Sequence, residues 1–192
     1  MGGEYRMLQV LSVLLIVALM TVVIDYMSRM SRNKLLPQML WLFFICYICG
    51  NLYFTLCSRE IGAGLHLDLV PFQTYLRLFK EPTPGTPSVS GLASVMLSGL
   101  LPVEGLILNI LLYYPLGYLL PILFPKLKPK HVILIGCLCS IATEATQYIL
   151  KMGWCETDDV IHNTLGTAIG VWVWHLQSKR LNKPPINELP KD

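Results

Sequence analysis

The chain has 192 residues, of which 54% are hydrophobic and only 14% are charged. Soluble domains carry about 25% charged residues, and a chain this short cannot bury so much apolar surface in one aqueous core, so the composition predicts an integral membrane protein. The formal net charge of +3 is small, and no basic run has the pattern of a nucleic-acid module, so we expect no nucleic-acid partner.

Apolar stretches along the chain predict an all-α fold with about five transmembrane helices. The hydrocarbon core of a bilayer is about 30 Å thick, so a spanning helix needs about 20 mostly apolar residues. The fifth stretch is shorter than the others and more polar at its start. In chain order, the stretches are residues 7–27, 39–57, 104–123, 131–150 and 160–177.

Lysine and arginine residues between these stretches indicate how the chain crosses the membrane, because cytoplasmic loops are enriched in basic residues. With the N-terminus outside, the inner pieces hold more lysine and arginine than the outer pieces. We therefore expect an N-out, C-in topology. The predicted division is an N-terminal anchor helix and basic inner loop over 1–38, a membrane domain over 39–177 and a short cytoplasmic tail over 178–192.

The largest piece between predicted spans, residues 58–103, is expected on the outer side. A turn-rich break, EPTPGTPSVSG at 81–91, divides two apolar flanks at 61–76 and 92–102. Both flanks are too short to cross the membrane. We therefore expect re-entrant or interfacial segments in this outer loop.

Glu144 is a carboxylic acid inside a predicted span. Placing such a group in hydrocarbon costs at least about 2.5 kcal/mol, so it usually faces protein or a wet cavity. By helical rise it lies about 9 Å below the outer end of its span, and Gln147 shares its face. Two interpretations stay open, an interhelical hydrogen bond and an outward-facing functional pocket.

Four polar residues stand at the predicted outer end of the fifth span: Asp158, Asp159, His162 and Asn163. The spacing of four residues stacks Asp158 with His162 and Asp159 with Asn163. Aspartates at a helix N-terminus also complement the helix dipole, so a capping role stays open beside a functional one. Capping does not explain the histidine and asparagine one turn further into the membrane.

Gly166 and Gly170 follow in a G-x-x-x-G pattern. Small residues at this spacing let a second helix approach closely, because no hydrophobic force drives helices together in lipid. We expect the neighbour to be the preceding span, residues 131–150.

The predicted topology places the polar residues of the fourth and fifth spans in the outer half of the membrane. Asn109 near the start of the third span and Arg59 at the end of the second are expected at a similar depth. A guanidinium at headgroup level either snorkels or contacts an anion. We expect one ligand-binding cavity lined by Arg59, Asn109, Glu144, Gln147, Asp158, Asp159 and Asn163. The candidate catalytic groups are Glu144, Asp158, Asp159 and His162.

The sequence predicts no metal site and no cofactor. Cys46 and Cys49 lie in mid-span without a nearby histidine or acid, which is typical of packing. Cys57 and Cys155 both fall at the expected outer face, where a disulfide is chemically allowed, and the sequence leaves their pairing open.

Three runs of residues closely resemble the VanZ-like family: LNILLYYPLGYLLP at 108–121, S-x-x-x-E-x-x-Q-Y at 140–148 and DDVIHNTLGTAIG at 158–170. TLCSRE at 55–60 and LDLVPFQTY at 67–75 resemble the family's upstream arginine and its N-L-I-P-F segment. The resemblance implies a small multi-helix protein of bacterial, mostly Gram-positive, cytoplasmic membranes. It also implies a link to low-level resistance to the glycopeptide teicoplanin, with which the family's namesake is associated.

The resemblance carries the family's motif onto a defined set of positions, and the chain departs from that motif at a few others. Asp68 replaces a common asparagine, His162 a usually apolar residue, and the loop with Trp154 and Cys155 lacks a frequent arginine. The positions that match the motif are Arg59, Pro71, Phe72, Asn109, Pro115, Gly117, Glu144, Gln147, Asp158, Asp159, Asn163, Gly166 and Gly170.

Three functions are compatible with these residues. The first is an envelope protein whose outward pocket binds a lipid headgroup or wall precursor, with membrane lipids, a lipid-linked cell-wall precursor or a lipophilic glycopeptide as partners. The second is an outer-leaflet enzyme on a lipid-linked substrate with Glu144 as acid or base. The third, a small transporter, is least favoured because the chain has no inverted repeat. The sequence leaves open whether the protein is an enzyme.

Overall fold

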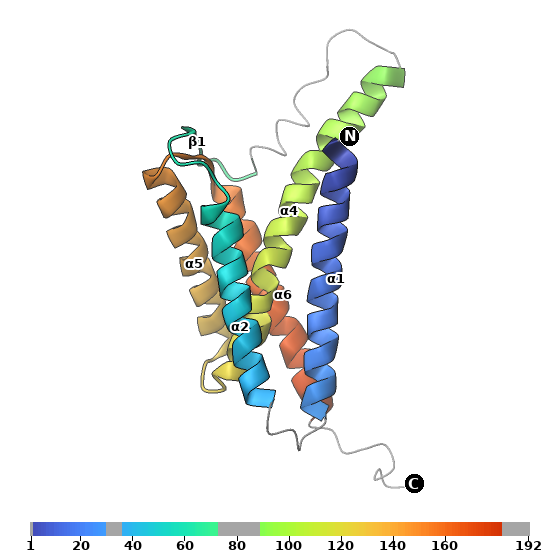
Figure 1. Cartoon of the computed structure of the whole chain (residues 1–192), viewed down its shortest axis with the longest axis vertical. Helices are drawn as coiled ribbons and strands as arrows, with labels where there is room; N and C mark the ends of the chain where they lie inside the picture. The colour runs from blue at the N-terminus through green and yellow to red at the C-terminus, as the bar shows by residue number, and fades with distance from the viewer. Residues whose placement is uncertain (1, 30–35, 73–88, 182–192) are drawn as a thin grey trace.

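The computed structural model describes residues 2–29, 36–72 and 89–181 and shows a bundle of long helices (Figure 1). Part of the predicted basic loop, most of the turn-rich break and the tail from residue 182 lie outside the described residues. The elements are α1 (Gly2–Arg29), α2 (Leu36–Leu52), the π-helical turn η1 (Tyr53–Cys57), β1 (Gly64–Asp68), α4 (Val89–Leu123), α5 (Pro129–Ile149), β2 (Met152–Glu156) and α6 (Thr157–Leu181).

Within the described residues, three segments are long and apolar enough to cross a membrane: Pro37–Cys57, Gly105–Leu123 and Pro129–Ile149. A shorter apolar segment, Leu14–Tyr26, lies within α1. The predicted all-helical membrane fold is thus confirmed. Consecutive helices alternate in direction, with α1, α4 and α6 running one way and α2 and α5 the other (Figure 1). The count of five crossings and the N-out orientation stay predictions.

Helix α6 packs mainly against α4 and secondarily against α5. Glycines make the first contact close: a Cβ added to Gly166 would overlap the carbonyl oxygen of Ile110, and one added to Gly170 would overlap that of Tyr114. The expectation of a close helix contact at these glycines is met, but the expected neighbour is wrong. Their partner is α4 rather than α5, because the two glycines lie on the face of α6 turned toward α4.

Side chains from all five long helices fill the interior of the bundle. One buried cluster joins Ile24 of α1 and Leu40 of α2 to Tyr118 of α4. A second joins Leu116 of α4 to Val132 of α5 and Val171 of α6. Many large apolar side chains on the outside of α1, α2 and α5 stay exposed, as expected for surfaces that face lipid.

The outer loop differs from its expected form in two ways. Residues 92–102, expected to form a separate re-entrant or interfacial segment, are the first part of the continuous helix α4. Residues 64–68 form β1, which pairs in parallel with β2 in a register that sets His66 opposite Trp154 and Asp68 opposite Glu156. The rings of His66 and Trp154 stack with their centroids 4.7 Å apart.

Candidate functional site

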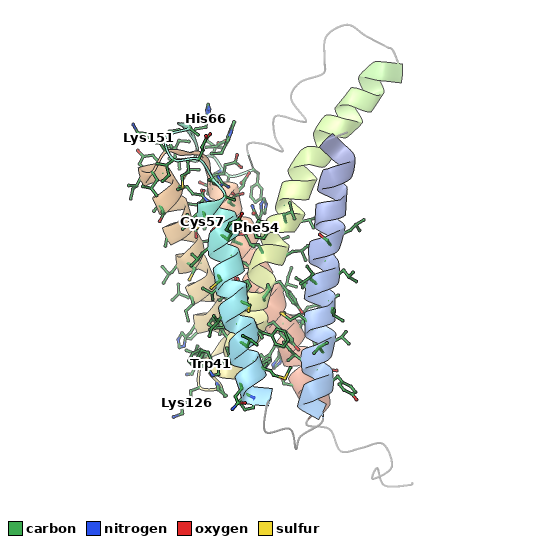
Figure 2. The ribbon with its side chains drawn as sticks, in the orientation of Figure 1. Trp41, Phe54, Cys57, His66, Lys126 and Lys151 are labelled. Atoms are coloured by element: carbon green, nitrogen blue, oxygen red, sulfur yellow. The ribbon has the colours of Figure 1, made fainter. Side chains whose placement is uncertain are left out.

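Polar and charged side chains gather at the end of the bundle that carries the two strands. Figure 2 places His66, Lys151 and Cys57 toward this end and Lys126 and Trp41 at the opposite one. Four elements and the turn after η1 contribute the central side chains, and we call these five residues the polar cluster: Arg59, Asn109, Glu144, Glu156 and Asp159.

Glu144 lies within the protein on the buried face of α5 and is 7% exposed. Its Oε2 atom accepts a hydrogen bond of 3.0 Å from the backbone N–H of Glu156. It also interacts electrostatically with Arg59 and with Asp159. The contacts of Glu144 with Glu156 and Asp159 arise because β2 follows α5 after a short turn and leads directly into α6.

Asp159 lies in the first turn of α6, outside the candidate spans. Asn109 of α4 donates a hydrogen bond of 2.5 Å from Nδ2 to its Oδ1 atom. Burial is the largest cause that raises the pKa of Asp159 to about 6, and the negative charge of Glu144 raises it further. Arg59 and the Asn109 hydrogen bond act in the opposite direction. Asp159 therefore titrates close to physiological pH.

Arg59 supplies the positive charge of the polar cluster. It follows η1, and its Nη1 atom donates a hydrogen bond of 3.3 Å to the carbonyl oxygen of Trp154 in β2. Glu156, the last residue of β2, has a raised pKa because it is buried and because Asp159, Asp68 and Asp158 lie nearby. The sequence did not identify Glu156 as a candidate, because Glu156 is placed beside the other acids only by the pairing of β2 with β1, which no local pattern predicts.

Asp158 and His162 form a separate pair beside the polar cluster. Asp158 is 6% exposed, and its Oδ1 accepts a hydrogen bond of 2.6 Å from the backbone N–H of Phe72. His162, 4% exposed, interacts with Asp158 one turn earlier. Asp158 therefore fixes the segment after β1 against the start of α6, a contact that the motif could not reveal.

Gln147 and Asn163 join the elements around Glu144. Gln147 donates a hydrogen bond of 3.0 Å from Nε2 to the carbonyl oxygen of Thr55, and Asn163 donates one of 2.8 Å from Nδ2 to Oγ of Ser140. Both side chains are almost fully buried, and within the part of the chain that the structure describes their carbonyl oxygens, Oε1 and Oδ1, have no hydrogen-bond partner.

The described residues contain no group of three or more His, Cys, Asp and Glu side chains arranged to hold a metal ion. Cys57 and Cys155 are both free thiols. The chemistry of the site is therefore that of interacting carboxylates with one guanidinium and several amides, which bind polar groups or exchange protons.

A family model described as VanZ/LLP1 matches residues 11–178. The chain belongs to the VanZ/LLP1 family. A curated relative, Protein VanZ of Enterococcus faecium, is 28% identical over 83 residues, which are 42% of this chain and 50% of the relative. The match thus spans about half the length of that relative. No solved structure matches the chain.

Family membership confirms the resemblance drawn from the motifs, and with the three apolar helices it identifies a membrane protein. The matched residues 11–178 include every member of the polar cluster as well as Asp158 and His162.

Proposed function

We propose that this VanZ/LLP1-family protein binds the polar headgroup of a membrane lipid or of a lipid-linked cell-wall precursor at the polar cluster. The observation that carries the proposal is the convergence of Arg59 from the turn after η1, Glu144 from α5 and Asp159 from α6 at one end of the candidate spans. Headgroups lie at this depth of a bilayer. Charged groups within a membrane bundle are costly, and they commonly mark a site for a polar ligand.

A groove beside the cluster supports a lipid as the ligand. It has a volume of about 310 Å³ and lies between α2, α4 and α5. Leu56 and Thr146 line it and are next in sequence to Thr55 and Gln147, whose hydrogen bond joins η1 to α5, while the five residues of the polar cluster do not themselves line the groove. Its other walls are mostly apolar, so a hydrocarbon chain would fit below a headgroup held at the cluster.

The resistance part of the proposal rests on the family. Protein VanZ of Enterococcus faecium shares the family, and the VanZ-like motifs imply an association with teicoplanin resistance. A protein that holds a wall precursor at the outer face of a bacterial cell membrane would change how a lipophilic glycopeptide reaches that precursor. We infer a multi-pass location in that membrane, with the polar cluster outward.

Susceptibility of a Gram-positive strain that expresses the protein tests this proposal. The wild type should raise the teicoplanin concentration needed to stop growth, and Glu144→Gln should abolish the increase. Glu60→Gln is the matched control, because Glu60 is an exposed acid beside Arg59 that lies outside the polar cluster. Equal protection by wild type and Glu144→Gln at equal expression would contradict a role for the cluster.

A second candidate, an enzyme on a lipid-linked substrate, is favoured by one observation. Asp159 has a pKa of about 6 and interacts with Glu144, and such a pair can take up and release a proton near neutral pH. Incubation of the purified protein with bacterial lipid extract would separate the two functions. Chemical conversion of a lipid that requires Glu144 supports catalysis, whereas retention of unchanged lipid supports binding.

A further inference from the structure

We propose that the polar cluster selects a headgroup that carries a primary ammonium group over one that carries only anionic groups. This inference rests on the proposed function and narrows it to a class of ligand. Two independent observations support it, the charge balance of the cluster and two buried carbonyl oxygens without partners.

Among the described residues, the charge balance of the cluster is negative. One guanidinium, Arg59, stands against the carboxyl groups of Glu144, Glu156 and Asp159. Asp158 adds further negative charge close to Glu156. Even with Glu144 protonated, the acids outnumber the arginine. A phosphate or carboxylate without a counter-charge would be repelled here, whereas a cation would be attracted, and partial burial strengthens both effects.

Hydrogen bonding points to the same class of ligand. Gln147 follows Glu144 by three residues on the same face of α5, and Ser140, which holds Asn163, precedes it by four. Among the described residues, Oε1 of Gln147 and Oδ1 of Asn163 have no hydrogen-bond partner. Gln147 and Ser140 are two helical turns, about 10 Å, apart on α5, so one ligand group reaches at most one of these oxygens. Both atoms accept hydrogen bonds and cannot donate.

A ligand that enters beside Glu144 satisfies one of these oxygens only if it carries N–H or O–H donors. A primary ammonium has three N–H donors and a positive charge, so it complements a carboxylate together with one of these acceptors, such as Oε1 of Gln147. A trimethylammonium group has the charge but no donor, and an ionised phosphate has neither. The expected order of affinity is therefore primary ammonium, then trimethylammonium, then an anionic headgroup.

The test uses the full-length protein in detergent and short-chain lipids with identical acyl chains, with binding measured by native mass spectrometry. The probes are phosphatidylethanolamine, phosphatidylcholine and phosphatidylmethanol, whose anionic headgroup carries no hydrogen-bond donor. Phosphatidylethanolamine should bind at least about tenfold more tightly than phosphatidylmethanol, the factor expected for one charge-assisted contact. Glu156→Gln should reduce this preference, and Glu60→Gln should leave it unchanged. The preference of the wild type is informative even if a variant does not fold.

Equal or tighter binding of phosphatidylmethanol, with binding still weakened by Glu144→Gln, would overturn the ammonium preference and leave the proposed function intact. Lipid binding that neither Glu144→Gln nor Glu156→Gln changes would contradict both. A lipid-linked peptide with a lysine side chain is a further probe. Tighter binding of this peptide than of phosphatidylethanolamine would assign the ammonium to a wall precursor, and the reverse order would assign it to a phospholipid.

Discussion

Asp159 shows at the scale of one residue how the cluster balances its charges. The carboxyl group is buried beside Glu144, and Asn109 and Arg59 offset only part of the resulting cost of ionisation. From the sequence, Asp159 could be named as a candidate site residue, but an aspartate at the start of an apolar helix is equally well explained as a helix cap. The partners that make it more than a cap come from α4 and α5, and no local pattern shows them.

The raised pKa predicts how stability depends on pH. The pKa of Asp159 rises from its ordinary value of 3.8 to about 6 on folding, so the folded protein binds the carboxyl proton more tightly than the unfolded chain does. The contribution of Asp159 to stability therefore falls as the pH rises from about 3.8 to about 6. Asp159→Asn removes the charge and keeps an oxygen for Asn109. It should melt a few degrees higher than wild type at pH 7 and lose this advantage near pH 4. A difference in melting temperature that does not change with pH would contradict this assignment.

At the scale of elements, the long helices could be predicted and the strands could not. The runs of apolar residues that a membrane requires fix the spans to within a few residues of α2, α5 and the second half of α4. β1 and β2 are each five residues long and far apart in the sequence, and their pairing depends on tertiary contacts. Glu156 was missed for this reason, and the neighbour of the α6 glycines was misassigned because spacing alone does not identify a partner.

The contact between α6 and α4 should fail when a side chain is added to it. Gly166→Leu would drive a side chain into the backbone of α4 at Ile110, and we expect a loss of stability of about 1–3 kcal/mol or more. Gly50→Leu is the matched control, since no atom lies within 4 Å of an added Cβ there. Melting temperatures in detergent would measure both. A drop for Gly50→Leu as large as that for Gly166→Leu would argue against close α4–α6 packing.

Across the whole molecule, alternating helices and an uneven distribution of charge suggest one orientation. The polar cluster lies at one end of the bundle, and Lys126, Lys128 and Lys130 lie around the α4–α5 connection at the other. The sequence predicts the latter end to be cytoplasmic, because short basic loops stay inside. The sequence alone predicts that the polar residues share one depth, but the hydrogen bonds among them required the fold.

Labelling of single cysteines in intact cells tests this orientation. On a cysteine-free background, a membrane-impermeant reagent should modify Lys151→Cys and spare Lys126→Cys, two exposed positions at opposite ends of the bundle (Figure 2). Modification of position 126 in sealed cells, with position 151 protected, would reverse the topology. It would also place the polar cluster on the cytoplasmic side.

The central claim is that the polar cluster holds a lipid headgroup, and the lipid that stays with the purified protein tests it most directly. Native mass spectrometry of protein extracted from bacterial membranes should show a lipid bound to the wild type and to Glu60→Gln, with most of it lost from Glu144→Gln. Folding of each variant is checked by its helical circular dichroism signal. Retention of the same lipid, in the same proportion, by a folded Glu144→Gln protein would contradict the account.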